Sequence, residues 1–576
     1  MSLPLLAGAV IIFLFVGYTL YGRFVARQYA LNDATPTPAH LQNDGVDFVP
    51  TKKFYLLGQH FSAIAAAGPI AGPILACQQF GWLPCLLWIV IGVVFIGAVH
   101  DFSSLVVSIR HGGHSIAEIV KQNIGKRAWL AMMIFLWIAL IYVIIAFTDI
   151  TAGTFVGRVE ELEGVQVGFE RGGAVAAAST MYLLLAILMG VVQKRWNPPL
   201  WLLTVVFVPA TLSVVWFGTQ ISTWLLFSQQ TWGLIILVYC FIASLLPVWM
   251  LLQPRGYLGG FILYMALILG VIGIFFGGYE IQQESFKTWS APGLTGSLFP
   301  FLFVTIACGA CSGFHGLVCS GTTSKQIARE SDCKPVGYGG MLLEGFVAVI
   351  ALATIMIMAP GDVKGSPGAI YGAGLGQFLT LLIGKENLLF AITFGAMAFS
   401  TFVFDTLDVT TRLGRYILQE LFGRTGQTGR TDRLTGALAT LATVGVPALF
   451  IMNAQEGGWK LFWILFGTSN QLLASLTLLA ITVWLHRVGK RYWFTLIPMV
   501  FVMIITFWSL LKQIDVAYQQ VLVREATAGV LPIINGVVAL LLLFLALGVT
   551  VESVLVFRRV NFAENLSVGR FPQQPR

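Results

Sequence analysis

Apolar residues dominate this chain in runs of about 20 positions, separated by short polar connections from one end of the sequence to the other. A helix of that length and composition spans the hydrocarbon core of a bilayer, whereas a soluble helix is apolar along one face only. The pattern predicts an all-α integral membrane protein with about fifteen transmembrane helices of roughly 20 to 28 residues. The predicted spans begin near Leu3, Tyr55, Trp82, Trp129, Ala174, Leu200, Thr231, Tyr257, Leu298, Tyr338, Leu388, Leu434, Gly458, Tyr492 and Val530.

The composition supports this class and excludes others. Of the 576 residues, 57% are hydrophobic and only 10% are charged, and the mean hydropathy is +0.83. No stretch is left over for a soluble catalytic domain, so we do not expect an enzyme. The net charge of +8 is spread over short loops rather than gathered in one patch, which argues against nucleic-acid binding. The seven cysteines lie mainly in apolar runs, so we do not expect a disulfide framework.

Lysine and arginine are divided unevenly between the two sets of alternate connections. One set holds 26 of the 34 basic residues and the other holds 8. Because basic loops favour the cytoplasmic side, we expect the N-terminus outside, the C-terminus inside, and the acidic loop 157–173 outside. The Gly-rich stretch 368–384, "GAIYGAGLGQFLTLLIG", would upset this alternation if it crossed the membrane. We expect it to be an external interfacial or re-entrant segment.

The second predicted span contains two Gly-Pro pairs four residues apart, "GPIAGP" at 68–73. Proline removes a backbone donor and glycine tolerates unwinding, so we expect the helix to break here near mid-membrane, with its outer half beginning near Ala71 to Ile74. Unpaired backbone groups inside a bilayer must face protein, water or a ligand. The alternative is a proline kink that only shapes packing.

A second interruption is predicted in the ninth span, where Gly309, Gly313, Gly316 and Gly321 punctuate the helix and its inner half begins near Gly316 to Cys319. Broken helices of opposite orientation in two halves of a chain are typical of inverted-repeat transporters. We therefore expect a 5+5 inverted repeat with peripheral helices. The predicted parts are a first span and linker (1–53), the first repeat (54–220), an inserted hairpin (221–297), the second repeat (298–486) and C-terminal helices with a tail (487–576).

Two stretches are similar to the carbon starvation protein family, CstA. They are "GPIAGPILACQQFGWLPCLLWIVIGVVFIGAVHDFSSLVVSIRHGGHSIAEI" and "CSGFHGLVCSGTTSKQIARESDCKPVGYGGMLLEG". The resemblance covers most of the first 420 residues and is weaker in the last third. It implies a transporter of pyruvate, with peptides as an alternative, related to transporters of amino acids, polyamines and organocations.

Polar residues inside spans are costly and are candidate functional residues. The candidates for substrate binding are His60, Gly68, Pro69, Gly72, Pro73, Gly313, His315 and Gly316. The candidates for ion coupling are His100, Asp101, Glu344, Ser400 and Thr401, of which the last two are chosen by analogy with the sodium site of LeuT-like transporters. In that analogy they face the carbonyls of residues 65–68, and the alternative is a packing role.

Two further groups favour structural interpretations. Asp408 and Arg412 lie four positions apart on one helix face, which predicts an ion pair next to Asp405. Cys308, Cys311, His315 and Cys319 also share a helical face. On one regular helix the outer cysteines are about 16 Å apart, too far for a single ion, so we expect no metal site. We expect no cofactor either, and "SGTTSK" lacks the spacing of a phosphate-binding loop.

Together these features predict a secondary transporter in the bacterial inner membrane. We expect it to import a small anion, most simply pyruvate, in symport with a cation, with the proton as the first candidate and sodium as the second. Peptide or amino-acid transport is the alternative within this class. A membrane-embedded redox subunit is the alternative outside it, and the shortage of histidine pairs at ligand spacing argues against haem. The sequence leaves the oligomeric state open.

Overall fold

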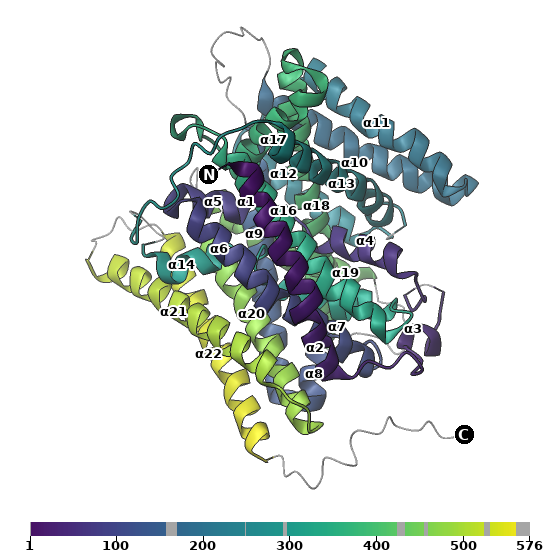
Figure 1. The fold of residues 1–576 in the computed structure, drawn as a ribbon, viewed down its shortest axis with the longest axis vertical. Coiled ribbons are helices and arrows are strands. Elements are labelled where there is room, and N and C mark those ends of the chain that lie inside the picture. The colour runs from purple at the N-terminus through teal and green to yellow at the C-terminus, as the bar shows by residue number, and fades with distance from the viewer. Residues whose placement is uncertain are drawn as a thin grey trace.

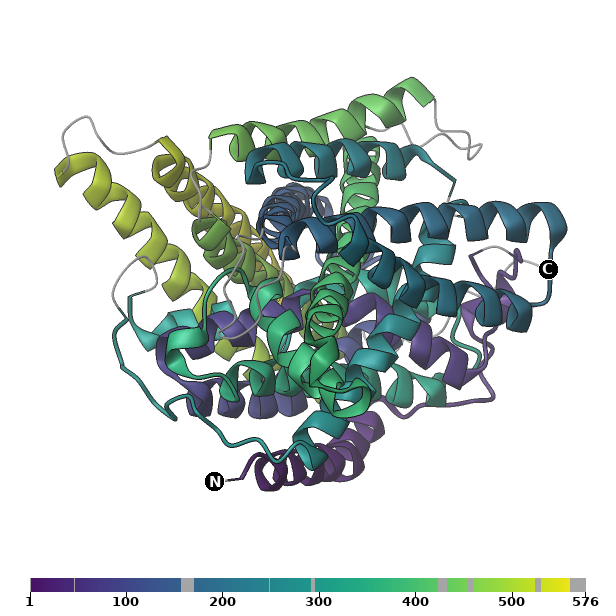
Figure 2. The same cartoon turned by 90° about the horizontal axis from the view of Figure 1, so that it is seen from above.

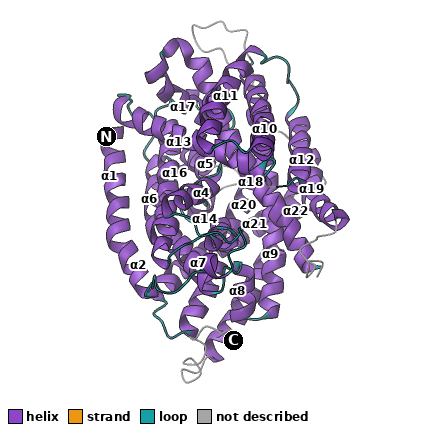
Figure 3. Ribbon diagram, turned by 90° about the vertical axis from the view of Figure 1, so that its right-hand side faces the viewer, coloured by secondary structure: helices purple, strands orange, loops and turns teal. Residues whose placement is uncertain are grey.

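The computed structural model describes residues 2–45, 47–156, 170–247, 249–291, 296–422, 433–453, 459–523 and 530–559. Within these residues the fold is built from helices and contains no β-strand (Figure 3). The predicted acidic loop is described only from residue 170 onward, and the predicted tail lies outside the described residues beyond 559.

The first half of the chain forms helices that alternate between long spans and short pieces. They are α1 (Leu3–Val16), α2 (Gly22–Tyr29), α3 (Pro38–Leu41), α4 (Lys53–Ile64), α5 (Gly68–Phe80), α6 (Trp82–Gly92), α7 (Ala98–Arg110), α8 (Ile116–Asn123), α9 (Lys126–Phe155), α10 (Arg171–Trp196), α11 (Leu200–Gln220), α12 (Gln229–Leu245) and α13 (Leu252–Phe276).

The second half continues in the same way. Its helices are α14 (Leu298–Thr305), α15 (Gly313–Gly321), α16 (Gly340–Met356), α17 (Pro367–Ile383), α18 (Leu388–Leu421), α19 (Arg433–Asn453), α20 (Trp459–Arg487), α21 (Trp493–Val523) and α22 (Val530–Arg559). Three π-helical pieces, η1 (Gly17–Tyr21), η2 (Val93–Gly97) and η5 (Lys334–Gly339), join α1 to α2, α6 to α7, and lead into α16.

Twelve helices of the described residues are long and apolar enough to cross a membrane, or thirteen if α4 and α5, bent by 45°, form one span. The chain is therefore a multi-pass integral membrane protein. The expected span near Thr231 is the shorter helix α12, and the one near Leu298 is divided between α14 and α15. For this reason the count of about fifteen is not confirmed. Helix α17 covers the Gly-rich stretch, and its interfacial placement stays a prediction.

The helices form a central group and a periphery. The apolar window of α20 is entirely buried, whereas only 22% of that of α11 and 28% of that of α22 is buried. Figure 1 shows α10 and α11 at one side of the molecule and α21 and α22 at the other, and Figure 2 shows α1 at the outer edge. The exposed apolar side chains of these outer helices match a hydrocarbon environment.

The two predicted repeats are packed into one another. Helix α5 from the first contacts α14 and α16 from the second, and α7 contacts α15. Both interrupted spans therefore lie side by side in the interior, although about 240 positions separate them in the sequence. The domain boundaries and the inverted symmetry remain predictions.

Candidate coupling site between the interrupted helices

The first interruption lies just before the Gly-Pro pairs. Residues 65–67 separate α4 from α5, and α5 begins at Gly68, so the expected start of this half-helix near Ala71 to Ile74 was wrong. Pro69 occupies the first turn of α5, where its missing N–H would have no helical partner in any case. Pro73 lies inside the helix. The motif thus starts the second half-helix.

The second interruption comprises residues 306–312, and α15 begins at Gly313, one turn earlier than expected. Neighbouring helices satisfy the carbonyls freed at this break. The indole nitrogen of Trp88 donates to Ile306 O and that of Trp463 to Thr305 O, each at 3.1 Å. The two indole N–H groups therefore pair carbonyl groups that would otherwise be unsatisfied inside a bilayer.

Asn470 of α20 caps the half-helix α15. Its Oδ1 accepts from Phe314 N at 2.9 Å, while its Nδ2 donates to Ser312 Oγ at 3.1 Å and contacts Cys308 Sγ at 3.3 Å. Sequence reasoning missed this residue. The signal was present, because Asn470 is a polar amide in the middle of an apolar span and is 3% exposed.

The candidate glycines serve close contacts between the interrupted spans. A Cβ on Gly72 would lie 2.6 Å from the carbonyl oxygen of Thr305, and one on Gly68 would collide with the Cys308 side chain. A Cβ on Gly313 would collide with the backbone of Asn470. Larger side chains would push the two breaks apart at Gly68 and Gly72, and would push α15 away from α20 at Gly313, so such variants disturb packing before they test substrate binding.

Three of the coupling and substrate candidates meet directly. His315 of α15 places Nδ1 at 2.9 Å from Asp101 Oδ2 of α7, and Nε2 at 3.2 Å from Glu344 Oε2 of α16. All three side chains are buried. One imidazole thus bridges two carboxylates from different helices, in the interior where neither acid has contact with bulk water.

His100 extends this cluster. Its Nδ1 lies 2.7 Å from Asp101 Oδ1, whereas its buried Nε2 has no hydrogen-bond partner among the described residues. The ring faces Gly316, where a Cβ would stand 3.3 Å away. A neutral imidazole that donates from Nδ1 keeps its lone pair on Nε2.

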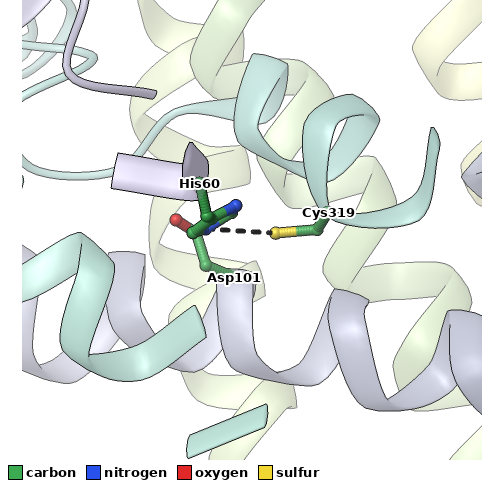
Figure 4. A group of neighbouring side chains, drawn as sticks. All are labelled: His60, Asp101 and Cys319. Carbon is green, nitrogen blue, oxygen red and sulfur yellow. Dashed lines mark hydrogen bonds between the residues drawn. The ribbon is translucent and has the colours of Figure 1, made fainter. Parts of the chain in front are cut away.

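His60 and Cys319 complete the group (Figure 4). His60 Nδ1 lies 2.9 Å from Thr323 Oγ1, and Nε2 lies 4.0 Å from Cys319 Sγ. Together with Asp101 they bring three atoms of metal-ligand type within 4.8 Å of one another. Both Asp101 oxygens already contact histidines, and Thr323 holds His60. We group these side chains by their proximity and call them the central cluster, which comprises His60, His100, Asp101, His315, Glu344 and Cys319.

The remaining cysteines of the predicted face separate from it. Cys308 lies at the second break beside Asn470, whereas Cys319 lies beside His60 about two turns into α15. Cys308 and Cys311 belong to the break at 306–312 and not to α15, so the single helical face predicted for the four residues was wrong, and the absence of a metal site stays a prediction.

Ser400 and Thr401 of α18 form no hydrogen bond to the cluster among the described residues. Ser400 Oγ lies 2.7 Å from Ser179 Oγ and donates to Met397 O at 2.9 Å, while Thr401 Oγ1 is buried and has no hydrogen-bond partner in the described parts of the chain. The contacts of Ser400 are those of a helix-packing residue. A sodium site at this pair remains a prediction.

The predicted pair of Asp408 with Arg412 was wrong in its partner. Asp408 bonds Arg255 of α13, and Arg412 instead donates to the carbonyls of Ala243 and Leu246, both at 2.9 Å. Arg255 also contacts Asp405 at 2.7 Å. We call Tyr239, Arg255, Asp405 and Asp408 the lateral network. The ion pair exists, but it joins two helices and is not local.

Comparisons with known proteins agree with these features. The sequence matches the family described as "Carbon starvation protein CstA" over residues 1–365 and 362–509. It is 35% identical to the "Peptide transporter CstA" of Campylobacter jejuni, covering 89% of this chain and 80% of the relative. For the protein of that name in Bacillus subtilis the identity is 32%, over 94% of both chains. For the "Pyruvate/proton symporter BtsT" of Escherichia coli it is 31%, over 86% and 79%.

Among solved structures, a mutant manganese transporter of Eremococcus coleocola aligns with 88% of this chain and 95% of its own, at 14% identity and a TM-score of 0.45. The long sequence matches, by contrast, extend through both interrupted spans and the central cluster. On this evidence the chain belongs to the carbon starvation protein CstA family.

Proposed function

We propose that this protein is a secondary transporter that imports pyruvate together with a proton, and that the central cluster binds the proton. The observation that carries the proposal is the buried bridge of His315 between Asp101 and Glu344, located where the two interrupted spans meet. The name of the relative BtsT supports both the substrate and the ion.

The charges of the bridge favour a cation that comes and goes. Two carboxylates flank His315, so even a doubly protonated imidazole leaves one negative charge on the bridge. Among the described residues, neither carboxylate forms an ion pair with a lysine or an arginine. A buried unpaired charge is costly. A proton on Glu344, or on Nε2 of His100, neutralises the unpaired charge and removes that cost. Release of the proton on the other side of the membrane restores the unpaired charge.

The substrate is assigned to the region where the two breaks meet, which is closely packed in this structure. A carboxylate suits the start of a half-helix and the neighbourhood of histidines, because both offer N–H donors without a permanently charged side chain. The cap by Asn470 already serves the start of α15. In this proposal the substrate carboxylate therefore lies nearer α5, His60 and His100, next to the group that takes up the proton.

Proteoliposomes with an imposed pH gradient provide the test. Uptake of labelled pyruvate should follow a gradient that is acidic outside and should be independent of sodium. His315→Gln should lose gradient-driven uptake, while His486→Ala, at the end of α20 and stacked on Phe557, should keep it. Wild-type uptake that follows only sodium, or that survives His315→Gln unchanged, would contradict the assignment of the proton to the cluster.

Peptide transport is the second candidate, because relatives with up to 35% identity carry that name. The same vesicles discriminate between the two. Unlabelled dipeptides and tripeptides should not compete with pyruvate if the proposal holds, and labelled dipeptide should not accumulate. Accumulation of a dipeptide without pyruvate uptake would transfer the proposal to peptides and leave the coupling site to be tested with that substrate.

A further inference from the structure

The connection between α2 and α4 crosses one end of the interrupted spans. We call residues 30–45 and 47–52 the strap. It belongs to the set of connections that holds 26 of the 34 basic residues, which predicts the cytoplasmic face. Residues 322–332, called here the exit segment, follow α15 directly and carry Thr323, the hydrogen-bond partner of His60.

The strap is hydrogen-bonded to the exit segment at several positions. Thr37 Oγ1 donates to Ile327 O at 2.6 Å, and Thr51 N donates to Gln326 O at 3.0 Å. At the other end, Asp33 accepts from the backbone N and the hydroxyl of Ser331, at 2.9 and 2.7 Å. The bonds from Ser331 hold the pKa of Asp33 below its ordinary value, so this carboxylate is charged at neutral pH.

An ion pair closes the centre of this contact. Arg110, at the end of α7, contacts both oxygens of Glu330 at 3.1 and 3.2 Å and donates to Tyr29 O at 2.8 Å. Glu330 also accepts from Asn32 N at 2.8 Å. The Glu330 side chain is 5% exposed. Three segments, namely the end of α7, the strap and the exit segment, are thus joined by one carboxylate.

A buried layer of hydroxyl groups lies between this ion pair and the central cluster. Ser108 Oγ is 2.9 Å from Ser324 Oγ, and Ser320 Oγ accepts from Ile116 N at 3.1 Å. With Thr323, these side chains have at most 3% exposure. The contacts are polar and small, unlike the interlocked apolar packing elsewhere in the core, so water and small polar solutes can replace them when the segments part.

We propose that the strap and the exit segment form the gate of the transporter on the basic face, with Arg110 and Glu330 as its latch. The structure is closed on this face. Access to the central cluster from this side requires the exit segment to move away from the strap. The reason is that the exit segment continues α15, which carries His315. The gate is also coupled to the cluster directly, because Thr323 belongs to the exit segment and contacts His60.

A reversible cross-link tests the gate. Asp33→Cys and Ser331→Cys place two thiols where the side chains now touch, and all seven native cysteines are buried. Treatment of the double variant with a short bis-methanethiosulfonate should lower pyruvate uptake at least tenfold, and dithiothreitol should restore it. Each single variant should be insensitive to the reagent. Full uptake by cross-linked protein would overturn the proposal.

A second measurement does not depend on the substrate, so it separates failure of the gate from failure of the proposed transport function. Ser324→Cys, read by mass spectrometry of the labelled peptide, should be protected from an impermeant maleimide applied to the basic face. Adding Arg110→Gln should increase its labelling at least fivefold. The matched control is Lys121→Gln, which breaks the exposed ion pair between Lys121 and Glu118 within α8. It should not increase the labelling of Ser324→Cys.

Buried Cys240 of α12 serves as an internal control for unfolding, because it lies in the lateral part of the protein. It should stay unlabelled in every variant. Labelling of Ser324→Cys that is unchanged by Arg110→Gln, or that rises equally with Lys121→Gln, would show that the latch does not close this path and would overturn the proposal.

Discussion

The interior of this protein holds two groups of charged side chains that contain two carboxylates each and differ in their cations. In the central cluster, the ion-pair partners of Asp101 and Glu344 among the described residues are histidines. In the lateral network, Asp405 and Asp408 face Arg255. Histidine loses its proton near neutral pH, whereas arginine keeps its charge in proteins. Under the proposed function, the first group would therefore change its charge during a transport cycle, whereas the arginine of the second group keeps its charge.

The two groups also differ in the hydrogen bonds that hold them. Arg255 donates to Asp405, to Phe404 O at 2.8 Å and to Tyr239 OH at 2.9 Å, and Tyr239 donates to Asp408 at 2.8 Å. This network ties α12 and α13 to α18. In the central cluster, His100 Nε2 and both oxygens of Glu344 have no hydrogen-bond partner among the described residues, although Glu344 Oε2 lies 3.2 Å from His315 Nε2. Arg255 Nη2 and Asp408 Oδ1 of the lateral network also lack one, so the contrast between the two groups rests on arginine against histidine and not on the number of hydrogen bonds.

The largest expected effect is on stability in the lateral network. Arg255→Met should lower the free energy of unfolding by about 3–5 kcal/mol, because two buried carboxylates lose their cation. Thermal unfolding in detergent and the yield of folded protein provide the measurement. The triple variant that adds Asp405→Asn and Asp408→Asn should recover most of the loss. An unchanged unfolding temperature for Arg255→Met would refute the structural role.

Glu344→Gln should have the opposite profile. It keeps the volume of the side chain but cannot exchange a proton, so pyruvate accumulation driven by a pH gradient should fall at least about tenfold, equivalent to about 1.4 kcal/mol. Exchange of pyruvate across the membrane without a gradient should persist, and unfolding should change little. Loss of folded protein instead would make the two groups alike and remove the contrast between them.

Tyr239→Phe should produce a smaller change that stays within the lateral network. It removes one hydroxyl between Arg255 and Asp408 and leaves both charges in place, which should cost about 1–3 kcal/mol of stability. Uptake per folded molecule should remain at the wild-type level. A specific loss of uptake without destabilisation would indicate that the lateral network takes part in transport.

The smallest effect is expected for the thiols. Replacing Cys308, Cys311 and Cys319 together by Ser should change uptake by no more than about twofold, equivalent to about 0.4 kcal/mol. Elemental analysis of the purified protein should find no stoichiometric transition metal. Zinc or iron present in the wild type and absent from the variant would instead make Cys319, His60 and Asp101 ligands, and would change the interpretation of the central cluster.

The sequence by itself determined the membrane class, the two interruptions and the identity of the costly residues. These follow from local chemistry: apolar runs of bilayer length, proline without a backbone donor, and ionisable groups that are expensive to bury. His60, His100, Asp101, His315 and Glu344 could all be selected on this basis. The boundaries of the breaks could not, because a Gly-Pro pair is compatible with the start of a helix as well as with its interruption.

Only the tertiary structure decided which of these residues meet. Helix periodicity identifies neighbours three or four positions apart, and it suggested Arg412 as the partner of Asp408. The actual partner, Arg255, is 153 positions away, and His315 reaches Asp101 across 214 positions. Asn470 likewise caps α15 from another span. Such pairs depend on how helices pack, and one sequence does not encode that packing in any local pattern, because every buried polar group only needs some partner.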